Sequence, residues 1–536
     1  MTQGHRIIRN AAALLASQPI TWALTLIFTV IVPRNVGPGE WGEWVIAGAV
    51  GNLAKALLDF GVNTVLFKGV SRYPKESRRT IGAAMTLRIC LTPVLMLGMI
   101  GFSWRAGYSE HTRVIVALVS LGAAASYIGM PILVGLQAFE KMHVGAITSV
   151  LSGLILTGGA IFLLKHLALG VVSICVVALA AQLVGLAVQW IVLSRTIKIR
   201  PVMDLDLIGQ LFREGLPYWA TFGFFTLYVW LDGVMISLIG STQENGWYGV
   251  ATQMIATLGF LPSAVTTAVF PTLARTMHTD HHEGGEVAGR SFRLVMTLSL
   301  PMSVGLAIVA NNLVTAIYGG WFAPAGPALA VLAFSLVPVY LATLVNGFLI
   351  AADKQVQWTW VMGAMCIVNL LLNLVTIPYF HGHYGNAALG AALALLVTDV
   401  AIGVVAVVLL PRNVRPAIKA GVRAILASAA ASVMMAAAVW PLRDRFVAVP
   451  ILTGAVVFTV AALALRVFPR EELRVLTGLA GRLAGRPSTM ARRSAGAAVA
   501  GTESAPAPVT ADAPVSVAAS PAYGVSARPF VPPARR

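Results

Sequence analysis

Residues 41–79, WGEWVIAGAVGNLAKALLDFGVNTVLFKGVSRYPKESRR, form an apolar run of membrane-spanning length that ends in a basic cluster. Four polar side chains interrupt the run, namely Asn52, Lys55, Asp59 and Asn63. At 100° per residue their spacing places all four on one narrow stripe of a single helix whose other faces are apolar. An ionisable group near the centre of a bilayer costs about 2.5 to 3.5 kcal/mol, so the stripe is expected to face a bundle interior or a wet cavity.

This stripe has two interpretations. Lys55 and Asp59 lie one helical turn apart and can neutralise each other, which would make them a local ion pair that helps helices pack. Alternatively, the stripe is the polar wall of a transport cavity. The sequence leaves both interpretations open.

The composition is that of a membrane protein. The chain has 536 residues, of which 57% are hydrophobic and 11% charged, whereas soluble domains contain about 25% charged residues. Runs of about 20 apolar residues, the length that crosses a bilayer as a helix, follow one another along most of the chain. The three cysteines, Cys90, Cys175 and Cys366, lie in such runs without metal-ligand spacing, so neither a disulfide framework nor a metal site is expected.

The pattern predicts an all-α polytopic protein with fourteen transmembrane helices. The expected spans are 11–32, 42–67, 81–103, 114–135, 145–164, 168–194, 213–239, 247–270, 292–317, 326–351, 357–379, 385–410, 420–440 and 446–468. We divide them into a first lobe of six helices (1–200), a second lobe of six helices (201–411) and two further helices (412–468).

The distribution of basic residues predicts the orientation of the chain. Loops on one side of the predicted membrane hold 20 Lys and Arg, and loops on the other side hold 6. Because basic residues collect in cytoplasmic loops, both termini are expected in the cytoplasm. The net charge of +17 is thereby explained by topology, and no nucleic-acid partner is expected.

The two lobes resemble each other weakly in sequence. Trp41-Gly42 and Tyr248-Gly249 open corresponding spans 207 residues apart, which predicts a parallel repeat with a central cavity. The loop 195–213 between the lobes is expected to contain a short amphipathic helix and to act as a hinge. After the last span, residues 469–487 are expected to form a basic amphipathic segment, and 488–536 an Ala/Pro-rich disordered tail.

Three motifs in order resemble a known family. They are VPRNVGPGEWGEW (Val32–Trp44), LLDFGVNTVLFKGVSR (Leu57–Arg72) and REGLPYWATFGFFTLYVWLDGVMISLIG (Arg213–Gly240). Together with fourteen spans they resemble the polysaccharide-transporter and oligosaccharide-lipid flippase branch of the multidrug/oligosaccharidyl-lipid/polysaccharide exporter superfamily. The resemblance implies two six-helix bundles, two C-terminal helices and alternating access for a lipid-linked oligosaccharide.

A polyprenyl diphosphate-linked glycan needs a wet cationic cavity, and this predicts the site residues. Lys55 and Arg88 are the basic residues placed well inside the first lobe, and we expect them to bind the anionic headgroup with Asn52 and Asn63 beside them. Asp59 is expected to orient Lys55 or to bind a coupling proton.

Two further acids, Asp232 and Asp399, are candidates for H⁺ or Na⁺ coupling, because an embedded carboxylate can bind either ion. No other cofactor is expected. Possible partners, besides membrane lipid, are the glycosyltransferases or the polymerase of polysaccharide assembly, in a bacterial cytoplasmic membrane.

Alternative functions remain at this point. The chain has no Walker A or GxSxG motif and short outer loops, so neither a hydrolase nor a membrane glycosyltransferase is expected. An ion-coupled multidrug antiporter would use Asp59, Asp232 and Asp399 as its main groups. A peptidoglycan-precursor (lipid II) flippase is a further alternative, although relatives of that kind have cavity arginines in the first span, where this chain has only Arg9 at the mouth.

Overall fold

The computed structural model of the chain describes residues 3–279, 281–352, 354–410 and 414–467. Helices joined by short turns make up these residues, which confirms the predicted all-α class. The predicted amphipathic segment 469–487 and the tail 488–536 lie outside the described residues.

The helices of the described residues, in chain order, are α1 (Gln3–Leu57), α2 (Val62–Arg72), α3 (Ser77–Arg105), α4 (Glu110–Ala138), α5 (Met142–Phe162), α6 (Val171–Thr196), α7 (Leu205–Ile239), α8 (Thr242–Leu258), α9 (Phe260–Thr279), α10 (His281–Tyr318), α11 (Ala325–Ala351), α12 (Gln355–Tyr384), α13 (Ala387–Leu409), α14 (Arg415–Val439) and α15 (Ala448–Ala464). Twelve helical segments of this part of the chain are long and apolar enough to cross a membrane, and α15 is a shorter apolar helix.

Helix α1 contains two of the predicted spans, because the chain reverses at Gly37. The rings of Phe28 and Trp44 are 5.5 Å apart, whereas sixteen residues of straight helix would separate them by about 24 Å. Gly37 has a φ of 79°, a left-handed conformation that glycine adopts without steric cost. The first arm of α1 therefore holds the first predicted span, and the second arm begins the second.

Two predicted spans are interrupted rather than continuous. The second span, 42–67, is divided between α1 and α2 by a turn at residues 58–61. The eighth span, 247–270, is divided between α8 and α9 at Gly259. Each of the other predicted spans falls on one helix or on one arm of α1.

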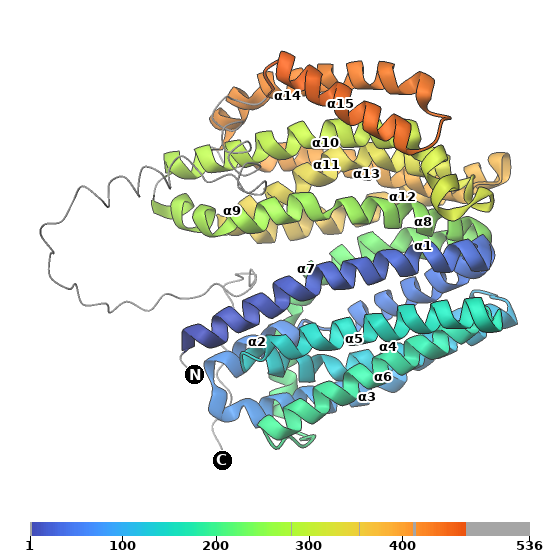
Figure 1. The fold of residues 1–536 in the computed structure, drawn as a ribbon. Helices are drawn as coiled ribbons and strands as arrows, with labels where there is room; N and C mark the ends of the chain where they lie inside the picture. Colours follow the sequence, from blue (N-terminus) through green and yellow to red (C-terminus); the bar gives the residue numbers. More distant parts are fainter. Residues whose placement is uncertain (1–2, 280, 353, 411–413, 468–536) are drawn as a thin grey trace, which may run out of the picture.

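The helices gather into two bundles (Figure 1). Helices α2–α6 lie together in the lower part of the view, α8–α13 lie above them, and α1 runs between the two groups. Helices α14 and α15 lie outermost, with α14 packed on α10. This arrangement agrees with the two predicted lobes and two additional helices.

The two lobes meet at the end of the molecule where α1 reverses. A Cβ atom on Gly42 would clash with the carbonyl oxygen of Thr242, and one on Gly246 would clash with the carbonyl oxygen of Pro38. We call these four residues the glycine crossing. Gly246 follows Gly42 by 204 residues and Thr242 follows Pro38 by the same number, so the two contacts are related by the internal repeat.

The same repeat positions two capping glutamates. Glu40 accepts a hydrogen bond of 2.8 Å from the backbone N–H of Val171, the first residue of α6. Glu244 accepts one of 2.6 Å from Ala387, the first residue of α13. These glutamates are also 204 residues apart, so the parallel repeat is present but the predicted offset of 207 is wrong by about one helical turn.

Helix α7 packs on both lobes. Leu207, Leu211 and Tyr218 in its first half are buried in the same apolar cluster as Leu66 of α2. Tyr228 in its second half is buried with α11 and α13. The separate amphipathic helix expected in the loop 195–213 is instead the first two turns of α7, which continues into the span although it contains Pro217.

Candidate functional site

A cavity of about 840 Å³ lies between the two lobes. Its walls come from α1, α4 and α6 of the first lobe and from α7, α8, α11 and α13 of the second. Because both lobes contribute, a rocking motion of one lobe against the other would change the shape and access of this space.

Lys55 is the one basic side chain among the described residues that line the cavity. It lies on the second arm of α1, half-buried, and no hydrogen bond or ion pair to another described residue is present. Asn52, one turn earlier, lines the same wall and donates a hydrogen bond of 2.9 Å to the carbonyl of Gly48. The ammonium of Lys55 is thus available to an anionic ligand.

Asp399 is the one acidic side chain among the described lining residues. It lies on α13, 5% exposed, and accepts a hydrogen bond of 2.5 Å from the hydroxyl of Tyr228 on α7. This bond joins two second-lobe helices at the cavity wall.

Asp59 and Arg88 form a buried ion pair that is not part of this lining. The guanidinium of Arg88 donates to Asp59 at 2.6 Å and to Asn63 at 3.2 Å. It also lies 4.2 Å from the ring centre of Tyr127. The predicted pairing of Lys55 with Asp59 is wrong for this structure, because the turn at residues 58–61 takes Asp59 off the stripe and toward Arg88.

The turn at residues 58–61 is held by side chains from two other helices, α4 and α7. Phe60 and Gly61 both have positive φ angles, 50° and 67°, so the helix cannot continue through them. The hydroxyl of Tyr127 on α4 donates to the carbonyl of Leu58 at 2.6 Å, and the indole N–H of Trp219 on α7 donates to Ala56 at 2.9 Å. These donors satisfy carbonyls that the interrupted helix leaves open.

The second lobe has a similar helix break, at which a tyrosine from a neighbouring helix also donates to a backbone carbonyl, but without an ion pair beside it among the described residues. The hydroxyl of Tyr340 on α11 donates to the carbonyl of Leu258 at 2.7 Å, where α8 ends. Met302 on α10 lies against Tyr340, with its sulfur 3.9 Å from the hydroxyl. Since α10 corresponds to α3 in the repeat, Met302 takes the place that Arg88 has in the first lobe.

Asp232 lies directly behind the cavity wall. It is 1% exposed and accepts hydrogen bonds from the hydroxyl of Tyr248 and, at 2.6 Å, from the amide of Asn373. Asn373 also donates to Asn369 at 3.0 Å. Of these residues Tyr248 lines the cavity, so one side chain, that of Tyr248, separates the carboxylate of Asp232 from the cavity.

The structure thus brings three of the predicted residues, Lys55, Asn52 and Asp399, to one cavity. Asn63, Asp59 and Arg88 form a separate buried cluster. The cavity is also lined by aromatic residues that were not predicted from the sequence, namely Trp41, Trp44, Trp230, Tyr228 and Tyr248. Their spacing within apolar helices resembles ordinary packing, and only the contacts between helices distinguish them.

A family model described as polysaccharide biosynthesis protein matches residues 7–277, just over half of the chain. The probable flippase AglR of Haloferax volcanii is 31% identical to the chain over 208 residues, which are 37% of this chain and 42% of that protein. The chain therefore aligns with less than half the length of this curated relative.

Solved structures have a similar fold. The lipid II flippase MurJ in an inward closed conformation matches with a TM-score of 0.70 and 14% identity, over 86% of this chain and 99% of that one. An inward-facing multidrug resistance MATE family transporter of the MOP superfamily matches with a TM-score of 0.58 and 13% identity, over 76% and 94%. At such identities the likeness shows the fold alone, which this chain shares with those two proteins.

Proposed function

Because this chain belongs to the polysaccharide biosynthesis protein family, we propose that it moves a polyprenyl diphosphate-linked oligosaccharide across the membrane by alternating access. The observation that supports this most directly is Lys55, the one base among the described residues of a cavity built by both lobes. A diphosphate is the anionic part of such a substrate, and a half-buried ammonium without a protein partner attracts it strongly. The lipid tail would remain in the bilayer while the headgroup crosses through the cavity.

Arg88 has a second role in this proposal. Its guanidinium is engaged by Asp59 and Asn63 in the state described above. It would contact substrate only after the turn at residues 58–61 rearranges, so Lys55 and Asn52 make the first contact.

Asp399 and Asp232 are the proposed coupling groups, with H⁺ or Na⁺ as the ion. Both carboxylates accept a hydrogen bond from a tyrosine that lines the cavity, Tyr228 and Tyr248 respectively. Binding of an ion to either carboxylate would weaken these bonds and alter the packing of α7 against α13 or α8. Asp59 is a weaker candidate because Arg88 already neutralises it.

The proposed location is a bacterial cytoplasmic membrane with both termini in the cytoplasm. The concentration of basic residues in alternate loops supports this orientation. Glycosyltransferases that build the lipid-linked glycan, or the polymerase that extends it, are the proposed functional partners.

Flipping assays on Lys55 variants test the proposal. In proteoliposomes containing a fluorescent polyprenyl diphosphate-linked oligosaccharide, Lys55→Ala is expected to slow flipping at least tenfold, and Lys55→Arg to retain most of it, since the charge is what binds the diphosphate. Lys165→Ala is the matched control, because Lys165 is exposed and is not among the residues that line the cavity.

Two results would contradict the proposal. Wild-type flipping by Lys55→Ala at normal abundance would remove the cationic cavity from the mechanism. Ion-driven export of cationic drugs without any flipping would favour the multidrug antiporter, and selective flipping of lipid II would favour the peptidoglycan alternative.

A further inference from the structure

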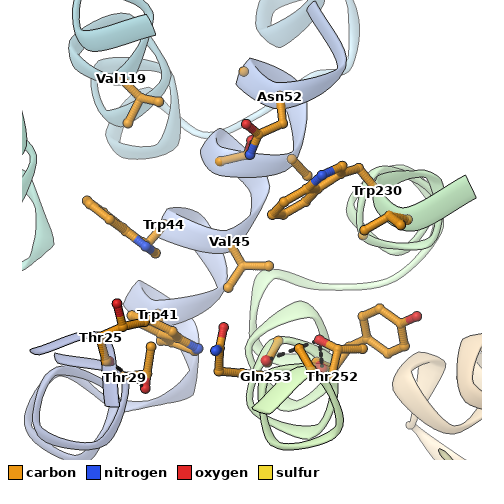
Figure 2. Close-up of a pocket in the computed structure, with 18 of the residues that line it drawn as sticks. Thr25, Thr29, Trp41, Trp44, Val45, Asn52, Val119, Trp230, Thr252 and Gln253 are labelled. Carbon is orange, nitrogen blue, oxygen red and sulfur yellow. Dashed lines mark hydrogen bonds between the residues drawn. The ribbon is translucent and has the colours of Figure 1, made fainter. Parts of the chain in front are cut away.

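Three tryptophans line the cavity between Lys55 and the glycine crossing. Trp41 and Trp44 come from the second arm of α1, and Trp230 comes from α7. Figure 2 shows the indole of Trp230 near Asn52, and the indole of Trp44 on the other side of this arm. Helices α1 and α7 thus both contribute indoles to the lining of the cavity.

The polar groups of this wall are amides and hydroxyls without formal charge. The side-chain amides of Gln182 on α6 and Gln253 on α8 line the cavity and have no hydrogen bond to another described residue. The side-chain carbonyl oxygen of Asn52 also has no partner within the described part of the chain, where only its nitrogen is bonded, to the carbonyl of Gly48. Each amide both donates and accepts, which suits a ligand rich in hydroxyl groups.

Trp41 adds an unsatisfied donor. Its side chain is 4% exposed, and its indole N–H has no acceptor among the described residues. Buried polar groups in folded proteins nearly always have a partner, so an orphan at a cavity wall indicates a partner that arrives from outside the chain.

The described lining has two formally charged side chains, Lys55 and Asp399. Trp44 precedes Lys55 by eleven residues, about three helical turns or roughly 16 Å along α1. Asp399 is engaged by Tyr228. A ligand held at Lys55 by its diphosphate would therefore meet only uncharged side chains along this arm.

We propose that Trp44, Trp230, Asn52, Gln182 and Gln253 form a carbohydrate subsite that holds uncharged sugar rings of the substrate, while Lys55 holds its diphosphate. This assignment rests on the proposed function. The apolar C–H face of a pyranose ring packs on an indole, and its equatorial hydroxyls exchange hydrogen bonds with the amides. A uronic acid placed here would bury a carboxylate without a basic partner, so acidic rings are disfavoured.

Binding measurements with two matched probes test the subsite. The full-length protein in nanodiscs would be titrated with a short-chain polyprenyl diphosphate bearing a neutral trisaccharide, and with the same polyprenyl diphosphate without sugar. Trp230→Ala is expected to raise the Kd of the glycosylated probe about tenfold and to leave the Kd of the bare probe unchanged. Lys55→Ala is expected to raise both.

Controls separate the subsite from general destabilisation. Trp360→Ala removes an indole that is 71% exposed on α12 and should change neither Kd. Gln253→Ala keeps the aromatic packing intact and should still weaken the glycosylated probe about threefold. A third probe with one glucuronic acid in the trisaccharide should bind less tightly than the neutral probe.

Different results would contradict the carbohydrate subsite and the proposed function. If Trp230→Ala and Gln253→Ala weaken both probes equally, or neither, the subsite is overturned while the proposed function stands. Equal binding of the neutral and acidic trisaccharides would overturn the preference for uncharged rings. If the wild-type protein binds neither the glycosylated nor the bare probe, the proposed function itself fails.

Discussion

The buried pair of Arg88 and Asp59 is the most constrained charge of the first lobe. Arg88 is 1% exposed, and its guanidinium contacts Asp59, Asn63 and the ring of Tyr127. Removing one partner from such a pair is strongly destabilising because the other charge stays buried, whereas replacing both with suitable neutral residues is often harmless. The second lobe shows which neutral residues fit, since Gly259 and Met302 occupy the corresponding places.

Arg88→Met is therefore expected to cost about 3 to 5 kcal/mol of stability, and the double variant Asp59→Gly with Arg88→Met to recover most of it. Melting temperatures of the purified protein in detergent would measure both. A double variant as unstable as the single would contradict the repeat-based assignment. A stable double variant that has lost flipping would show that the pair has a role in transport beyond stability.

Sequence reasoning identified the residues that bear charge but not their partners. The interpretation of Lys55 and Asp59 as one stripe required a continuous helix, but the helix breaks at residues 58–61. Gly61 is the one residue of this turn whose type could have indicated the break, and a single glycine inside an apolar run is a weak signal. The bond between Tyr228 and Asp399 joins residues 171 positions apart. Such pairs depend on how helices pack, and the periodicity of a single helix gives no information about them.

The helix breaks in the second and eighth predicted spans are equivalent positions of the internal repeat. In each lobe a tyrosine from a neighbouring helix donates to the carbonyl of a leucine, Tyr127 to Leu58 and Tyr340 to Leu258. Spans of the right length and order were predictable from hydropathy alone. The offset was misjudged because Gly249 resembles Gly42 in sequence, while it is Gly246 that makes the equivalent close contact.

Gly42→Ala tests the glycine crossing. The added methyl group would meet the backbone carbonyl of Thr242, which cannot rotate away, so α1 and α8 must separate. We expect a loss of about 1 to 3 kcal/mol of stability, as for other overpacked sites, and a reduced flipping rate.

Gly39→Ala is the matched control for that experiment, because a Cβ atom on Gly39 would have nothing within 4 Å. Melting temperature and flipping should be near wild type in this variant. Equal effects of the two substitutions would mean that the crossing is looser in the membrane than described here.

Helix α7 belongs to both lobes, because its two halves pack in different apolar clusters. Leu207 and Leu211 in the first half of α7 are fully buried in the first lobe, and Tyr228 in its second half is bonded to α13. The boundary at residue 200 predicted from the sequence stays a prediction, and the packing of α7 leads us to expect that the first lobe needs this helix.

Limited proteolysis of two membrane-inserted fragments would test this expectation. A fragment of residues 1–240 should be more resistant to protease than one of residues 1–204, because only the longer one covers Leu66 and its neighbours with α7. Equal resistance would indicate that the first lobe completes its core without α7.

The shared use of α7 also orders events during synthesis. The first lobe stays open along one face until Leu207 and Leu211 have left the ribosome. At about 5 to 20 residues per second, Asp399 follows Tyr228, 171 residues earlier, by roughly 9 to 34 s. During that interval the first half of α7 is packed on the first lobe, while Tyr228 in its second half does not yet have its partner Asp399. The helix that completes the first bundle is therefore already in place when the helices of the second bundle pack on it.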